Sequence, residues 1–134
     1  MDAAGALTPV PGSPFPGAGV NSNVPLLAPR DQILFLSNQL SDSVTVFNVA
    51  ANGSLTLVSG SPFKVFGNGN PTQMATTRKG DFLCVVNRNK LVSALSVSST
   101  GALTPVAGSP FLTGNAAAVS QPAGVYPPKR CGVD

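Results

Sequence analysis

The groups that could catalyse a reaction in this 134-residue chain are few. It contains no Glu and no His, so its acid–base groups are five aspartates: Asp2, Asp31, Asp42, Asp81 and Asp134. Asp31 and Asp81 each precede an apolar run, and Asp42 opens a predicted strand. At such places an Asp commonly accepts hydrogen bonds from nearby backbone N–H groups. We therefore favour turn roles for these residues, and the sequence identifies no catalytic residue.

The sequence does offer candidate residues for substrate binding. Four cations lie near one another in the sequence: Arg78, Lys79, Arg88 and Lys90. A guanidinium group binds phosphate or carboxylate oxygens in pairs, so Arg78 and Arg88 are candidates for holding a sugar acid. Solvated loop charge is the alternative. Asn87 is a third candidate because, like Asn38, it ends a predicted strand, although such an amide also suits the bonding of backbone groups in the bend.

No cofactor and no metal are expected. The chain lacks His, and its two cysteines, Cys84 and Cys131, do not have metal-ligand spacing or form a disulfide framework. Cys84 lies within the apolar run 82–86, where a Cys is usually a small buried hydrophobe.

The elements that must position these residues follow from a repeat. The stretch Gly5–Phe15 returns almost unchanged at Gly101–Phe111 and in a looser form at Gly53–Phe63, so the starts lie 48 residues apart both times. A fixed period of this length is typical of arrays and propellers. Within the repeated Gly-Ser-Pro-Phe we expect a structural role: Gly allows a sharp exit, Pro keeps the preceding Ser extended, and Phe packs between repeats.

Each period divides into four predicted strands. They span 24–28, 33–36, 44–49 and 54–58 in the first full repeat, and 72–77, 82–86, 91–97 and 102–106 in the second. Short turns such as Asn52-Gly53 separate them. Four strands joined by short turns are the unit of a β-propeller blade. The chain is therefore predicted to be all-β, with about two complete blades of four antiparallel strands plus partial flanking strands.

This parsing divides the chain into four parts. Residues 1–23 are predicted to be the fourth strand (6–10) and exit loop of a partial blade, 24–69 the first complete blade, and 70–117 the second. Residues 118–134 would start the next blade at 121–125 and continue as an irregular tail. The repeat register is lost after about Val125, which resembles a truncated or frame-shifted reading frame.

Composition excludes several classes of function. Only 10% of the residues are charged, and the net charge of +3 comes from scattered basic residues, whereas nucleic-acid binding needs a clustered basic face with aromatic residues. We therefore predict no nucleic-acid partner. No segment reads as a signal peptide or a membrane span, so no membrane partner is expected. The compartment is unknown, with the cytoplasm as the default.

The repeat residues carry a family resemblance. Asp81–Asn87 (DFLCVVN) resembles the second-strand signature of the YVTN-type repeat, and Asp42–Phe63 is similar to the third-to-fourth strand passage of lactonase-type seven-bladed propellers. Those proteins include the 6-phosphogluconolactonase-like enzymes. The resemblance covers nearly the whole chain up to about Val125, and it implies fewer than three blades of a seven-bladed ring.

The resemblance implies a fragment of a protein that hydrolyses a sugar-acid lactone. Family enzymes draw catalytic residues from several blades, so whether this chain is an enzyme stays open. A propeller binding or scaffold module and an inactive gene fragment are the alternatives. Two blades would also leave two apolar faces open, so self-association through the open blade faces is a further expectation.

Overall fold

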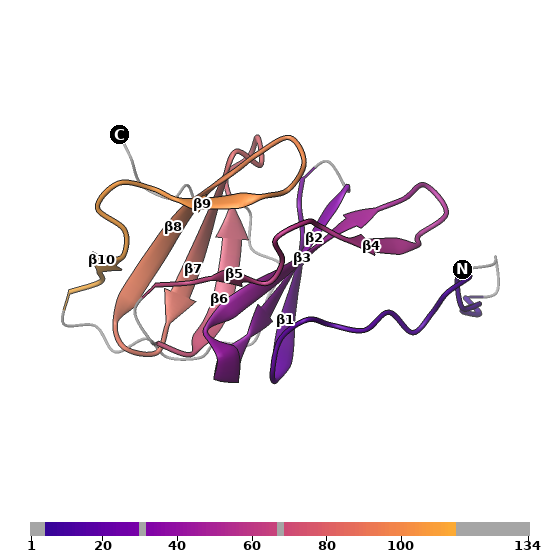
Figure 1. The fold of residues 1–134 in the computed structure, drawn as a ribbon, viewed down its shortest axis with the longest axis horizontal. Helices are drawn as coiled ribbons and strands as arrows, with labels where there is room; N and C mark the ends of the chain where they lie inside the picture. Colours follow the sequence, from indigo (N-terminus) through magenta and orange to yellow (C-terminus); the bar gives the residue numbers. More distant parts are fainter. Residues whose placement is uncertain (1–4, 30–31, 67–68, 115–134) are drawn as a thin grey trace.

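Two antiparallel sheets make up the fold in a computed structural model, which describes residues 5–29, 32–66 and 69–114. We call the first sheet blade 1 and the second blade 2 (Figure 1). Blade 1 contains β1 (Ser22–Leu27), β2 (Ile33–Asn38), β3 (Ser43–Val49), β4 (Leu55–Leu57) and β5 (Phe63–Lys64), with a 3-10 turn, η1 (Gln39–Ser41), between β2 and β3. Blade 2 contains β6 (Pro71–Thr76), β7 (Phe82–Asn87), β8 (Leu91–Val97), β9 (Leu103–Pro105) and β10 (Phe111–Leu112).

The prediction of four-stranded antiparallel blades is confirmed. The order β1-β2-β3-β4 in blade 1 recurs as β6-β7-β8-β9 in blade 2. Two short strands were not predicted: β5 pairs with β3, and β10 pairs with β8. They begin at the Phe of the Gly-Ser-Pro-Phe loops. A Pro argues against a regular strand at its place, so the sequence pattern did not indicate these two strands. The blade boundaries at residues 23, 69 and 117 stay a prediction.

The predicted strand at residues 6–10 is wrong, because residues 5–10 form no strand. A fourth strand pairs with the third strand of its own blade, as β4 does with β3. No strand of the described part of the chain pairs with residues 5–10. The first strand predicted at 121–125 and the tail lie outside the described residues.

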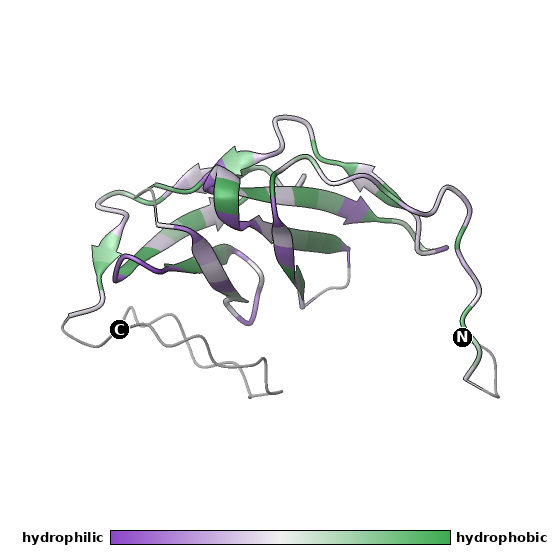
Figure 2. Cartoon of the chain, turned by 90° about the horizontal axis from the view of Figure 1, so that it is seen from below, coloured by the Kyte–Doolittle hydropathy of each residue, from purple (hydrophilic) through white to green (hydrophobic). Residues whose placement is uncertain are grey.

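The hydrophobic core lies between the two blades. Strand residues alternate between the two faces of a sheet, and the strands are accordingly banded with apolar and polar residues (Figure 2). Blade 1 contributes Phe35, Val44 and Val46 to the core, and blade 2 contributes Leu83 and Val85; all five side chains are fully buried. The single described core is therefore an interface between blades.

The Gly-Ser-Pro-Phe loops are structural, as predicted. Ser61 Oγ accepts a hydrogen bond from the Val46 N–H at 2.8 Å, and Ser109 Oγ accepts one from the Ala94 N–H at 2.9 Å, at the equivalent place. The Ser–Pro peptide bond is cis in all three loops, and each Gly has positive φ. Phe63 is half-buried against the core, so it packs between the blades as expected.

Candidate functional site

Three amide side chains gather at one end of blade 1. Gln39 Oε1 accepts hydrogen bonds from Asn21 Nδ2 at 3.1 Å and from Asn23 Nδ2 at 3.3 Å. Asn23 Oδ1 in turn accepts a bond from Ser37 Oγ at 2.9 Å. We call Asn21, Asn23 and Gln39 the amide cluster. Asn21 and Asn23 are exposed, so the cluster presents both donors and acceptors to solvent, which is the chemistry that sugar hydroxyls require.

Strand pairing explains why these residues meet. β1 runs antiparallel to β2, so the start of β1 lies beside the end of β2, with Ser22 opposite Asn38. Gln39 follows directly in η1. Blade 2 repeats the arrangement, since Pro71 at the start of β6 lies opposite Asn87 at the end of β7. The residues that follow Asn87 therefore lie at the same end of their blade as the amide cluster.

Sequence reasoning missed the amide cluster, although one signal was available. The link between the second and third strands has four residues in blade 1, 39–42, and three in blade 2, 88–90. The extra residue accompanies η1 and places Gln39 over the start of β1. An extra residue in one of two otherwise regular repeats indicates a local specialisation. Alignment of the two repeats in the sequence reveals it.

The two asparagines at the strand ends are buried and hydrogen-bonded within the protein. Asn38 is fully buried, and its Nδ2 donates to Ser43 Oγ at 3.1 Å and Thr45 Oγ1 at 2.9 Å. Asn87 is 1% exposed, and its Nδ2 donates to Ser93 Oγ at 3.0 Å. Both amides tie the end of a second strand to the third strand. The substrate-binding role suggested for Asn87 stays a prediction, but contact with a ligand would need this burial to change.

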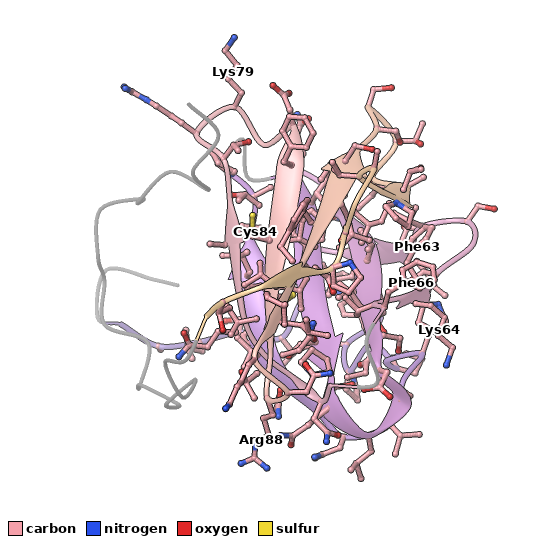
Figure 3. All side chains as sticks on the ribbon, turned by 90° about the vertical axis from the view of Figure 1, so that its left-hand side faces the viewer. Phe63, Lys64, Phe66, Lys79, Cys84 and Arg88 are labelled. Carbon is pink, nitrogen blue, oxygen red and sulfur yellow. The ribbon has the colours of Figure 1, made fainter. Side chains whose placement is uncertain are left out.

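The two candidate arginines lie at opposite ends of blade 2. Arg78 is in the turn before β7 and Arg88 is in the turn after it, and both are exposed. Lys79, beside Arg78, and Arg88 mark these two ends in Figure 3. β7 has six residues, which separate the two turns by roughly 20 Å of strand. The structure therefore brings Arg88 next to Asn87 and does not bring Arg78 to that place.

Asp42 connects the two blades. It adopts a left-handed conformation (φ 47°) at the end of η1, and its Oδ1 accepts a hydrogen bond at 2.9 Å from the N–H of Asn70, just before β6. We expected Asp42 to accept a backbone N–H of its own turn, whereas the hydrogen bond that the structure shows joins it to the other blade. In blade 2 the equivalent position is Lys90, which also has positive φ and whose carbonyl accepts from the Thr113 N–H.

The opposite end of the blades contains a cleft of about 290 Å³. It lies between the β1–β2 connection of blade 1 and the β6–β7 and β8–β9 connections of blade 2. Its lining residues are Ala28, Pro29, Gln32, Ile33, Lys79, Gly80, Asp81, Val97, Ser98 and Ser99. The lining combines one cation, one carboxylate and apolar side chains such as Ile33 and Val97.

Two expectations about single residues need correction. The side chain that supports the β6–β7 turn is Thr77, whose Oγ1 accepts from the Phe82 N–H at 3.2 Å, where we expected Asp81. Cys84 is half-buried on β7, because its side chain points away from blade 1, and its sulfur is part of a disulfide bond. Asp2, Asp31, Cys131 and Asp134 lie outside the described residues.

Metal-binding clusters and membrane-spanning helices are absent from the described ranges. No group of three or more Cys, Asp or Glu side chains there could hold a metal ion. No helix in the same ranges is long and apolar enough to cross a membrane.

The sequence profile of the family described as "Lactonase, 7-bladed beta-propeller" matches residues 6–120. The chain belongs to this family. The match covers both blades and the N-terminal segment, which confirms the resemblance to lactonase-type propellers. No curated protein sequence matches this lactonase-family chain significantly.

Solved structures show the same fold. A provisionally assigned 6-phosphogluconolactonase from Bacteroides fragilis is 27% identical, with a TM-score of 0.62 over 73% of this chain and 28% of the other. The periplasmic gluconolactonase of Pseudomonas aeruginosa is 25% identical, with a TM-score of 0.60 over 78% of this chain and 29% of the other. A functionally unknown protein from Desulfotomaculum acetoxidans is 21% identical, with a TM-score of 0.67, and is matched over 32% of its length. The chain thus spans less than a third of each of these structures.

Proposed function

We propose that this chain forms two blades of a lactonase-type propeller and that it contributes a sugar-acid lactone-binding surface at the end that carries the amide cluster. The observation that carries the proposal is the family match over residues 6–120, together with exposed amides at that end. Lactone hydrolysis adds water to the ring carbonyl carbon and breaks its bond to the ring oxygen. The full reaction therefore needs a base near the carbonyl and donors for the oxyanion.

The residues at this end are suited to binding a sugar acid and less suited to transferring protons. The amide cluster can both donate to and accept from sugar hydroxyls, and Arg88 can pair with a phosphate or carboxylate on the sugar acid. The described carboxylate at the same end, Asp42, accepts the Asn70 N–H and stabilises the contact between blades. We infer that the base comes from other blades of a complete ring.

The compartment is part of the same proposal. The Pseudomonas aeruginosa relative is a periplasmic protein. We propose the cytoplasm as the default compartment. Fractionation of the source cells with an antibody against the chain would test this, and recovery in a periplasmic extract would overturn it.

The binding proposal is tested with the purified chain and 6-phosphogluconate, the stable hydrolysis product of the phosphorylated lactone. Chemical shifts would be followed by NMR as the ligand is added. We expect Arg88→Ala to weaken binding about tenfold, which corresponds to about 1.4 kcal/mol, because a charge-assisted hydrogen bond is lost. Arg78→Ala is the matched control, since it removes the same charge from the opposite end of β7 and should leave the affinity unchanged.

Two results would argue against this proposal. Equal loss of affinity in the two arginine variants would mean that only net charge attracts the ligand. Shifts confined to the cleft around Lys79 and Asp81 would place the ligand at the other end of the blades. A chain that binds no sugar acid would favour the alternative of a scaffold module, which the buried strand-end asparagines and their structural hydrogen bonds also support.

A further inference from the structure

The cleft at the end opposite the amide cluster has walls that belong to the contact between the blades. Gly80 places the β6–β7 turn against the β1–β2 connection, since a Cβ on Gly80 would lie 3.7 Å from Pro29 Cδ. Gly101 places the β8–β9 turn in the same way, because its Cβ would lie 3.6 Å from Ile33 Cδ1. Both glycines have positive φ, 79° and 87°, which an L side chain rarely adopts. The cleft therefore lies where packing holds three connections together.

Hydrogen bonds fix the shape of the cleft walls in blade 2. The Gly101 N–H donates to the Ser98 carbonyl at 3.0 Å, and Ser98 Oγ accepts from the Ala102 N–H at the same distance. The Val97 N–H donates to the Asp81 carbonyl at 2.8 Å, which joins the β6–β7 turn to the end of β8. None of these bonds uses the side-chain carboxylate of Asp81, so this carboxylate is not needed to build the turns.

Four polar side chains of the cleft lining are exposed and have no hydrogen-bond or ion-pair partner among the described residues. They are Gln32, Lys79, Asp81 and Ser99. Lys79 and Asp81 carry opposite charges on the two sides of Gly80, yet they do not pair with each other. Lys79 lies at the upper end of the molecule in Figure 3, far from Arg88. The cleft thus offers ammonium donors and carboxylate acceptors, together with an amide and a hydroxyl that can do both.

Apolar side chains are the second component of the lining. Ile33 and Val97 are half-buried, so part of each still contacts water, and Ala28 is 7% exposed. A ligand with an aliphatic part would remove this apolar surface from water, which favours binding. The cleft volume of about 290 Å³ is close to the lower limit of about 300–1,000 Å³ for sites that hold drug-sized ligands. Its size therefore suits a small metabolite with a short aliphatic chain.

We propose that this cleft binds a free aliphatic α-amino acid. The carboxylate of the ligand pairs with the Lys79 ammonium, and the ammonium of the ligand pairs with the Asp81 carboxylate. The aliphatic chain of the ligand covers Ile33 and Val97. Both charges of such a zwitterion find an opposite partner, whereas a sugar acid would bring its negative charge beside Asp81. The site and the amide cluster lie at opposite ends of the blades, so its failure would leave the proposed sugar-acid binding untouched.

An NMR titration of the purified chain with L-leucine tests the proposal. We expect saturable shifts of the Gly80, Ser98 and Ser99 amide signals. The dissociation constant should be on the order of 1 mM, because a ligand with so few atoms has little surface to bury. The signals of Gln39 and Arg88, at the other end of the blades, should not change.

Three analogues of leucine test each part of the ligand separately. Isocaproate lacks the ammonium group, isoamylamine lacks the carboxylate, and free glycine lacks the aliphatic chain. Each should bind at least about fivefold more weakly than leucine, since each leaves one part of the cleft without its partner. This comparison uses the unaltered chain, so its result does not depend on the folding of any variant.

Substitutions in the β6–β7 turn then assign the two charges. Lys79→Gln and Asp81→Asn should each weaken leucine binding about fivefold, because each removes one exposed charge pair. Arg78→Gln is the matched control, since Arg78 adjoins Lys79 but does not line the cleft, and it should leave the affinity unchanged. Lys79→Gln should also leave the affinity for isoamylamine unchanged, because that ligand has no carboxylate to pair with Lys79. Circular dichroism would verify that the variants fold.

Several results would overturn the proposal. A chain that shows no saturable shifts at about 10 mM leucine does not contain the site. Shifts centred on the amide cluster would place the amino acid at the other end of the blades. Equal losses in Arg78→Gln and Lys79→Gln would mean that only the net charge of the turn attracts the ligand. Equal affinity for leucine and isocaproate would exclude the pairing with Asp81.

Discussion

Removal of the Phe35 ring tests whether the two blades share one core. Phe35 is 0% exposed on β2, with Leu26 and Val46 as its neighbours on the adjacent strands. Transfer of the ring to water costs about 2–3 kcal/mol. The cavity left in Phe35→Ala adds about 1–2 kcal/mol after partial collapse, so the total lies near 4 kcal/mol, within the usual range for such a substitution.

That loss is large for a domain of this size. Folded domains are stable by about 5–15 kcal/mol, so Phe35→Ala should remove roughly a third or more of the total. The assay is urea unfolding followed by far-UV circular dichroism at one fixed protein concentration. With a slope of about 2 kcal/mol per molar urea, the unfolding midpoint of Phe35→Ala should fall by about 2 M.

Phe82→Ala provides the matched comparison, because Phe82 is 42% exposed on the neighbouring blade. Because the folded side chain keeps that much contact with water, the same substitution should cost about half as much or less. A loss below about 1 kcal/mol for Phe35→Ala, or equal losses for the two variants, would refute the reasoning. The blades would then not pack through the face that contains Phe35.

Three further substitutions give smaller, separable effects in the same assay. Phe63→Ala should cost about 1–3 kcal/mol, less than Phe35→Ala, because the ring is only half-buried against the core. Ser61→Ala should cost about 1–3 kcal/mol, since it leaves the Val46 N–H without the acceptor that now lies 2.8 Å away. Gly69→Ala should cost about 1–3 kcal/mol, because the new Cβ would lie 2.5 Å from Asn87 Cβ and the loop must shift.

Two controls bracket these effects. Ser13→Ala changes the equivalent but exposed Ser of the N-terminal loop and should alter stability by less than about 0.5 kcal/mol. Gly17→Ala places a Cβ 3.4 Å from Ser22 Oγ, an ordinary contact, and should be tolerated. If Ser13→Ala is as costly as Ser61→Ala, the hydrogen bond to β3 is not the cause. A neutral Gly69→Ala would show that Asn87 is less tightly packed than described.

Sequence reasoning was accurate where local signals decide the outcome. The eight predicted strands of the two complete repeats correspond to β1–β4 and β6–β9, with their ends shifted by a few residues. Strand ends moved because hydrogen bonding with a neighbour extends a strand past its apolar run. The predicted second strand covered residues 33–36, but Ser37 and Asn38 also belong to β2 because they pair with Val44 and Ser43.

The candidate site was less predictable because its residues meet through pairing. Asn21 and Gln39 are 18 residues apart in sequence, and neither has a neighbouring motif that signals chemistry. Arg78 and Arg88 looked like one cationic group in the sequence, yet a whole strand separates them. Sequence proximity within a β-protein says little about proximity in space when the chain runs straight between two turns.

The sequence by itself determined the repeat, the all-β class and the blade unit. Those properties depend on alternation of apolar residues and on turn residues such as Asn52-Gly53, which act over a few positions. Only the tertiary structure decided which neighbour covers each face. Val44 and Val92 have the same residue type and the same place in the repeat, yet Val44 is sealed between two blades and Val92 is half-buried. Burial depends on the element across the interface, and no local pattern within a blade contains that information.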